Sequence, residues 1–373
     1  MTVIKTINWP VKFGLHLAAS WPGTPLPVLH KLFWLLVLIP FQICQYSYVF
    51  MHYKSDTLIE TIDNLSISLS FSLVFIKLCI AWLHPNLVRD ILSIMEEECQ
   101  KYTVLDTHNL ISKTIYLSYR LTNFVLSMCV TSTIFFALAI LVFQENGTSK
   151  KLILNMDLPF DINQSSTYGL VLIIQYVCQI TSAYTFSVFT SFLLVAVLHA
   201  GCQIDIMCRT LLEVPYKNTK QLKFFIKRHQ EIIMFTEKIE QFFTYIALTE
   251  LLSDTLVTCC LGYLIVIALQ TENGLATLVK STVFYVLMCL DAFIYCFAGE
   301  YLSIKSKVIS DTAYEFLWYN LHPYESQLLI VVMLRAQKGF TFTFGKFASL
   351  SLESFTSIMK ASASYMSVLL AMT

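Results

Sequence analysis

The last long apolar segment of the chain, residues 347–372, carries a regular row of polar side chains. Its members follow one another at steps of four, three, four and three residues: Glu353, Ser357, Lys360, Ser364 and Ser367. On a helix this spacing places all five on one face. Because an ionised side chain is costly in hydrocarbon, we expect Glu353 and Lys360 to face protein or water rather than lipid. Two functions fit this pattern: the wall of an ion pore, or packing against neighbouring membrane helices through small hydroxylated residues.

Other apolar segments also contain ionisable side chains, among them Lys77, Glu250, Asp254 and Asp291. Glu250 and Asp254 share a helix face near one end of their segment, where we expect them to reach the membrane interface. Asp291 lies deeper, and such a position suits either a hydrogen-bonded core carboxylate or an ion-coupling acid of a secondary transporter. Against a transporter, the sequence has no detectable inverted repeat, and Gly or Pro does not visibly break a helix in the middle of the chain.

No arrangement of residues typical of an enzyme is present. The chain has no Walker loop, no H-E-x-x-H and no G-x-S-x-G sequence, and its 8 His residues are scattered. The 11 Cys residues fall almost entirely within apolar segments or predicted cytoplasmic connections, so we interpret them as small buried side chains rather than a disulfide framework. We therefore expect no catalytic residues, no metal site and no cofactor. Basic and acidic residues number 25 each, which gives no reason to expect a nucleic-acid partner.

The composition is that of a membrane protein. Of the 373 residues, 56% are hydrophobic and 13% are charged, whereas about 25% are charged in soluble domains. Segments of about 20 apolar residues can cross a bilayer, and the candidates are residues 32–51, 65–83, 121–143, 168–198, 246–269, 278–298 and 347–372. The sequence thus predicts an all-α membrane protein with seven transmembrane helices. No internal repeat divides it, so we expect residues 1–373 to form one domain.

Lys and Arg are distributed unevenly among the connections between these segments. The N-terminal region and every second connection after it hold 19 of them, and the alternate connections hold 3. By the positive-inside rule, the N-terminus is cytoplasmic and the C-terminus extracellular. The N-x-S/T sequons at Asn64, Asn146 and Asn163 all fall on the predicted extracellular side, where we expect glycosylation. This orientation is opposite to that of G-protein-coupled receptors.

Three stretches outside the predicted spans also have the pattern of helices: residues 89–102, 221–243 and 323–338. The last begins at His322-Pro323, has an apolar face that includes Leu329 and Val332, and stops before Gly339. Apolar-faced helices outside the membrane need a packing partner. Because all three lie on the predicted cytoplasmic side, we expect them to form a helical anchor platform, within one subunit or between subunits.

The C-terminal quarter carries a set of short motifs. In order they are Thr312-Ala-Tyr-Glu-Phe-Leu-Trp-Tyr, Met333-Leu-Arg-Ala-Gln-Lys, Gly345-Lys-Phe, Leu350-Ser-Leu-Glu-Ser-Phe and Ser364-Tyr365. Together with the seven spans and the inverted orientation, they resemble the signature of the insect odorant receptors. Gly339 stands where that family usually has proline, and Phe344 where it usually has a small residue. The ending of the chain is closer to this family than to its sister family, the gustatory receptors.

The resemblance implies a ligand-tuned subunit of a ligand-gated, non-selective cation channel in the plasma membrane of sensory-neuron dendrites. Such a subunit is surrounded by lipid and assembles as a heterotetramer with the odorant receptor co-receptor. In that family the last helix lines the pore. Carried onto this chain, the pore and gate positions are Lys360, Ser364, Val368 and Met372. The resemblance favours a pore over simple packing for the polar row, with a gustatory-type receptor channel or a secondary transporter as the alternatives.

The resemblance also implies a small volatile odorant, bound among the outer halves of the second, third, fourth and sixth helices. A site of this kind is apolar with few polar groups. The candidate lining residues at about that depth are Phe71, Phe75, Phe135, Phe136, Tyr176, Gln179, Tyr285 and Met288. Because apolar lining and apolar core have the same composition, we expect about half of these side chains to touch ligand.

Overall fold

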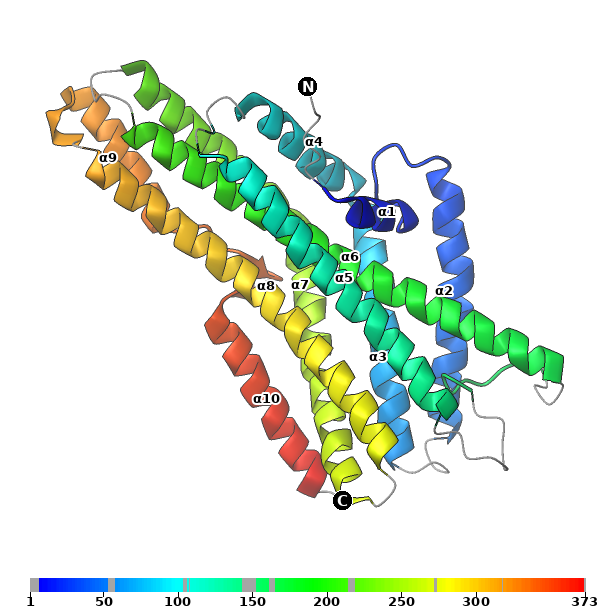
Figure 1. The fold of residues 1–373 in the computed structure, drawn as a ribbon. Helices are drawn as coiled ribbons and strands as arrows, with labels where there is room; N and C mark the ends of the chain where they lie inside the picture. Colours follow the sequence, from blue (N-terminus) through cyan, green and yellow to red (C-terminus); the bar gives the residue numbers. More distant parts are fainter. Residues whose placement is uncertain are drawn as a thin grey trace.

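The structure of the protein, a computed structural model, is built from long α-helices (Figure 1). It describes residues 7–52, 58–102, 106, 108–142, 152–160, 165–213, 219–271, 274–316 and 318–371. The helices are α1 Trp9–Leu17, α2 Pro27–His52, α3 Leu58–Leu83, α4 Pro85–Tyr102, α5 Leu110–Val142, α6 Ser165–Leu212, α7 Thr219–Gln270, α8 Leu275–Glu315, the short 3-10 helix η2 Trp318–Asn320, α9 Pro323–Gln337 and α10 Leu352–Ala371. An antiparallel hairpin of two short strands, β1 Thr343–Phe344 and β2 Ala348–Ser349, precedes α10.

Six of the described helices, α2, α3, α5, α6, α7 and α8, are long and apolar enough to cross a membrane. The last expected span corresponds to α10, whose 20 residues reach a similar length but include the polar row. α2 suits a lipid-facing position, because large apolar side chains such as Phe33, Leu36 and Phe50 are exposed along it. The predicted all-α fold of membrane-spanning helices is thereby confirmed.

Three helices are much longer than a bilayer requires: α6 has 48 residues, α7 has 52 and α8 has 41. At 1.5 Å per residue they extend roughly 60–80 Å, against a hydrocarbon core of about 30 Å. In Figure 1 one end of each helix runs past α10 and gathers beside α9. The membrane span and the extension outside it are therefore one continuous helix in all three cases.

The extended ends of α6, α7 and α8 pack with α9 around an apolar cluster of their own. Its buried members include Ile204, Met207, Phe225, Ile309, Leu329 and Val332. An ion pair between Lys305 Nζ and Asp205, at 2.6 Å, ties α8 to α6 beside this cluster. The helices predicted over residues 89–102, 221–243 and 323–338 are present as α4, the first part of α7 and α9. The predicted platform of helical extensions is therefore confirmed. Below, the platform means the extended ends of α6, α7 and α8 together with α9.

Buried charged residues attach α4 to the platform. Arg228 on α7 donates hydrogen bonds of 2.6 Å to Glu98 Oε1 and to Gln203 Oε1. His199 Nε2 on α6 lies 2.8 Å from Glu98 Oε2. Burial alone would raise the pKa of Glu98, but the hydrogen bonds from His199 and Arg228 hold it below its usual value. This one carboxylate thus joins three helices.

A left-handed backbone connects α9 to the hairpin before α10. Gly339, which follows α9 by two residues, has φ +76°, and Gly345 in the hairpin turn has φ +57°. Glycine adopts such values without the steric penalty that a Cβ brings, whereas the proline ring fixes φ near −65°. Gly339 therefore fits a local turn that a proline at this position could not form.

Candidate functional site

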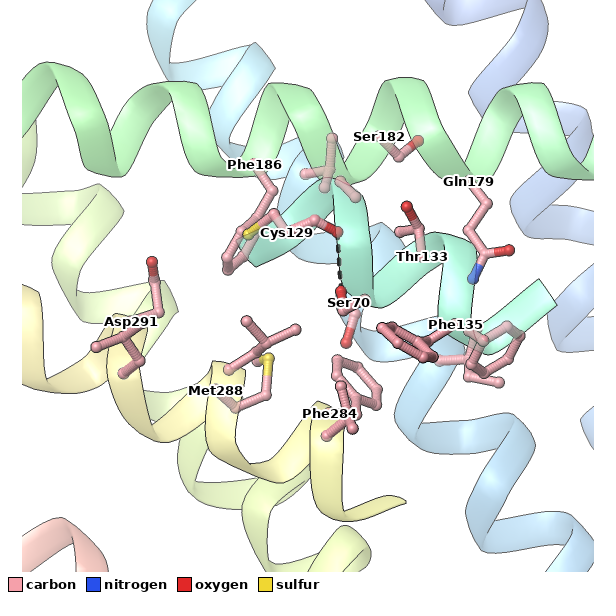
Figure 2. A pocket seen from close by; sticks show the side chains of 18 of the residues that line it. Ser70, Cys129, Thr133, Phe135, Gln179, Ser182, Phe186, Phe284, Met288 and Asp291 are labelled. Carbon is pink, nitrogen blue, oxygen red and sulfur yellow. Dashed lines mark hydrogen bonds between the residues drawn. The ribbon is translucent and has the colours of Figure 1, made fainter. Parts of the chain in front are cut away.

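A cavity of about 150 Å³ lies between α3, α5, α6 and α8 (Figure 2). It occupies the halves of α6 and α8 that are distant from the platform. Its aromatic lining residues are Phe71, Phe135, Phe136, Phe186 and Phe284. Small side chains from three helices, Ser70, Cys129, Ser182 and Ala183, line it as well. Larger residues at these small positions would fill the space, so the sequence itself keeps the cavity open.

Most hydroxyls of the cavity wall are satisfied by helix backbone. Ser70, Ser132 and Thr133 each donate to a carbonyl in the preceding turn of their own helix, at 2.7 to 2.9 Å. By contrast, Gln179 Oε1 and Ser182 Oγ on α6 have no hydrogen-bond partner among the described residues. Leaving a buried polar atom unpaired costs about 1–3 kcal/mol. The wall therefore suits a small, mostly apolar molecule that makes a hydrogen bond to α6.

Lys280 places a positive charge on the α8 side of the cavity. Its Nζ forms an ion pair with Asp63 on α3 and lies 4.8 Å from the centre of the Phe136 ring. Because Asp63 compensates the charge, Lys280 closes the wall between α3 and α8 rather than offering a free cation to a ligand.

Five of the eight ligand-binding residues expected from the sequence line this cavity: Phe71, Phe135, Phe136, Gln179 and Met288. The other three lie elsewhere. Phe75 borders a groove between α2 and α3, and Tyr176 packs against the main core one turn before Gln179. Tyr285 packs in a cluster that includes residues of α10 together with Phe284 and Met288, but it does not line the cavity.

Many of the lining residues were not expected from the sequence, among them Cys129, Ser182, Phe186 and Phe284. Phe284 lies four residues before the expected Met288, and Ser182 lies three residues after the expected Gln179. Residues three or four apart share one face of a helix. Extending each expected position by one helical turn would therefore have found Phe284 and Ser182, and Phe186 one turn further on.

The inner end of the cavity meets a group of buried charged residues. Asp291 lines the cavity and accepts a hydrogen bond of 2.7 Å from Thr190, as the core-carboxylate interpretation requires. Lys77 Nζ lies 2.6 Å from a carboxylate oxygen of Glu250. Glu250 and Asp254 are 0% exposed, so the expectation that they reach the membrane interface is wrong. The packing of α7 against α3 and α8 turns both acids into the bundle.

α10 packs on α7 and α8 through one face. The hydroxyls of Thr258 and Ser362 lie 2.9 Å apart, and the ring centres of Phe293 and Phe355 lie 5.7 Å apart. Gly262 on α7 lies close to α10, because a Cβ there would come within 2.7 Å of the Met366 sulfur and the Met366 side chain would have to shift.

The opposite face of α10 is exposed and holds the polar row. Lys360 and Ser364 are exposed there, and Val368 is 58% exposed. Met372 lies outside the described residues. A membrane-length helix cannot leave an ionised face in lipid at low cost, so this face calls for water or other polypeptide.

The structure also bears on the sequons. Asn64 lies inside α3 and is 6% exposed. A glycan needs an accessible amide in a surface segment, so the expected glycosylation of Asn64 does not fit this fold. Asn146 and Asn163 lie outside the described residues.

Comparisons with known proteins agree with these features. The family model described as 7tm Odorant receptor matches residues 57–363. Odorant receptor 10 of Aedes albopictus is 28% identical over 55% of this chain and 56% of its own length. The odorant receptor coreceptor of Ooceraea biroi is 25% identical over 40% of this chain and 30% of its own length. The chain thus spans about half the length of the first relative and less of the second.

A solved structure resembles the whole chain. The insect olfactory receptor OR5 from Machilis hrabei, in complex with eugenol, matches with a TM-score of 0.79 over 98% of both chains, at 14% sequence identity. At this level of identity the likeness concerns the fold.

Proposed function

Because the chain belongs to the 7tm odorant receptor family, we propose that it is the ligand-binding subunit of an odorant-gated, non-selective cation channel. The observation that carries this proposal is the cavity between α3, α5, α6 and α8. These are the second, third, fourth and sixth membrane helices, among which the family resemblance implies a ligand. We propose no catalytic activity, and we treat residues 1–373 as one functional unit.

The proposed ligand is a small, mostly apolar volatile molecule with one hydrogen-bonding group. Contact with aromatic side chains such as Phe136 and Phe284 supplies most of the affinity, at about 25 cal/mol per Å² of buried apolar surface. The Gln179 side-chain amide offers an acceptor at Oε1 and a donor at Nε2, so it suits a hydroxyl, which can both donate and accept a hydrogen bond. Small ligands gain at most about 1.5 kcal/mol per heavy atom and usually much less, so we expect micromolar potency.

The proposed pore is lined by the polar row of α10, with Lys360, Ser364 and Val368 facing the conduction path and Met372 completing the gate. A pore wall that is exposed in a single chain needs further subunits to close the pore. We propose that these include the odorant receptor co-receptor, in a heterotetramer. Similarity to coreceptor sequences over 40% of the chain supports a common subunit architecture.

α8 connects the proposed ligand site with the proposed pore helix. Met288 lines the cavity, and Phe293, little more than one turn away, contacts Phe355 on α10. A ligand shifts a closed–open equilibrium only by the difference between its affinities for the two states. We propose that the open state fits the ligand better and moves α10 outward through α8 and α7.

The proposed orientation places the N-terminus and the platform in the cytoplasm and the cavity toward the outside of the cell. It rests on the 19-to-3 bias of Lys and Arg. We propose the plasma membrane of sensory-neuron dendrites as the location, with Asn146 and Asn163 as the candidate glycosylation sites.

The test is electrical. Cells that express the chain with the co-receptor are expected to give odorant-evoked unitary currents from a panel of small volatile alcohols and phenols. Cells with the co-receptor alone should respond only to the co-receptor's own agonist. Saturable substrate uptake without unitary currents would instead identify a transporter.

A further inference from the structure

Behind the cavity, at the meeting point of α3, α6, α7 and α8, lies a second polar site. Glu250, Asp254 and Asp291 each place a carboxylate oxygen within 4.8 Å of the others. Glu250 and Asp254 are 0% exposed, and Asp291 is 4% exposed. Figure 2 shows Asp291 at one end of the cavity, so the group borders a space that a small ion can enter. We call these three residues the acid cluster.

The charges around the acid cluster do not balance within the described part of the chain. The basic side chain that reaches it is Lys77, whose Nζ pairs with Glu250 at 2.6 Å and lies 3.6 Å from the centre of the Phe186 ring. One positive charge cannot compensate three carboxylates. An uncompensated ionised carboxylate in a dry interior costs several kcal/mol, so the cluster needs further positive charge or protons.

Asp254 shows where the missing positive charge belongs. No donor in the described residues hydrogen-bonds to either of its carboxylate oxygens, although the side chain is fully buried. The hydroxyl of Tyr295 is another buried oxygen with no hydrogen-bond partner in the described residues. The centre of the Tyr295 ring lies 5.7 Å from Lys77 Nζ. Oxygen atoms that surround one Ca²⁺ at 2.3–2.6 Å lie at most about 5 Å apart. The spacing within the acid cluster therefore matches a set of oxygen ligands around one ion.

We propose that Glu250, Asp254 and Asp291 bind one hard metal cation, Na⁺ or Ca²⁺, inside the helix bundle. The cation joins α7 to α8, and Asp291 makes it a neighbour of the cavity. The Asp254 carbonyl accepts a hydrogen bond of 2.6 Å from Thr258, and Thr258 contacts Ser362 on α10 at 2.9 Å. The site thus lies one helical turn from the contact that holds the last helix.

The test measures thermal stability and does not depend on channel activity, so it fails or succeeds separately from the proposed function. The purified full-length chain is melted in NaCl, in CaCl₂ and in choline chloride at equal ionic strength, because choline is too large for the site. We expect a saturable rise in melting temperature with Na⁺ or with Ca²⁺, on the order of 5 °C at 100 times the dissociation constant. The salt that produces the rise identifies the ion.

Asp254→Asn is the informative variant, because Glu250→Gln would leave Lys77 without its partner. We expect Asp254→Asn to lose the cation-dependent rise while being at least as stable as the native chain in choline, since an uncompensated buried charge has been removed. Asp311→Asn, which changes an exposed acid on α8, the helix that carries Asp291, should keep the rise.

Two results would overturn the proposal. The first is a native chain whose melting temperature is the same in all three salts, which would mean that protons neutralise the acid cluster. The second is a rise that persists undiminished in Asp254→Asn, which would place the cation elsewhere. The native titration decides the first point even if the variant does not fold.

Discussion

At the scale of single residues, Phe284 and Tyr285 separate ligand contact from packing. Both pack in the cluster that includes residues of α10, but Phe284 lines the cavity and Tyr285 does not. Burial of one such side chain is worth roughly 1.5–3 kcal/mol, so Phe284→Ala is expected to raise the odorant concentration for half-maximal current about 10- to 100-fold. Tyr285→Ala should alter expression or the maximal current instead. Equal potency shifts in the two variants would remove Phe284 from the site.

Two serines test the polar part of the cavity. Ser182→Ala and Ser70→Ala each remove one side-chain hydroxyl from the cavity wall. Ser182 Oγ has no hydrogen-bond partner in the described chain, whereas Ser70 Oγ donates a hydrogen bond to a backbone carbonyl. A hydrogen bond contributes about 1 kcal/mol. We expect Ser182→Ala to weaken responses to hydroxyl-bearing odorants about fivefold, and neither change to affect the response to a hydrocarbon of the same shape. Dose–response curves for a matched alcohol and alkane make the comparison.

At the scale of elements, the attachment of α4 depends on Arg228. Removing one partner of a buried ion pair costs about 3–5 kcal/mol, because the other charge stays buried. Arg228→Met is therefore expected to lower the melting temperature of the detergent-solubilised protein by several degrees. Lys227→Met is the control, since Lys227 is exposed and lies 4.0 Å from Glu231. Similar losses in both variants would contradict the role of Arg228.

The same contact gives the platform a pH dependence. The pKa of Glu98 is lowered in the folded protein, so its contribution to stability is present above the unfolded pKa and is lost as the pH falls through the folded value. The difference in melting temperature between the native chain and Arg228→Met is thus expected to shrink as Glu98 becomes protonated in acid.

The two faces of α10 differ in what they should do in a channel. Cysteine is introduced at Ser364, Val368, Ser362 and Leu369, one position at a time, and a charged thiol reagent is applied from outside during odorant stimulation. Positions 364 and 368 lie on the exposed face, 362 is buried and 369 packs toward α7. We expect modification at 364 and 368 to change the current. Block of the current at position 362 or 369, with no effect at position 368, would show that the pore lies on the other face of α10.

At the scale of the whole molecule, the orientation in the membrane is the open prediction. The platform carries much of the basic charge, and Figure 1 places it at the opposite end of the bundle from the end of α10. An epitope tag after Thr373 should be stained on intact cells, and a tag before Met1 only after permeabilisation. Surface staining of the N-terminal tag would show that the orientation is the reverse of the predicted one, and that odorant enters from the other side.

The sequence by itself determined the features that depend on neighbours along the chain. The apolar spans, the amphipathic helices of the platform and the polar row of α10 all follow from local periodicity. A helix presents residues three and four apart on one face wherever it packs. The depth of a residue along a helix also follows from its place in the sequence. Five of the eight expected residues therefore do line the cavity.

Only the tertiary structure decided how each helix is rotated about its own axis. On a helix that is apolar all round, hydropathy does not distinguish Phe284 from Tyr285, and one residue corresponds to about 100° of rotation. Rotation also turned Glu250 and Asp254 into the bundle and buried Asn64 in α3. Contacts between residues far apart in the chain fix these rotations, because they bury complementary surfaces and pair the charges that hydrocarbon would exclude.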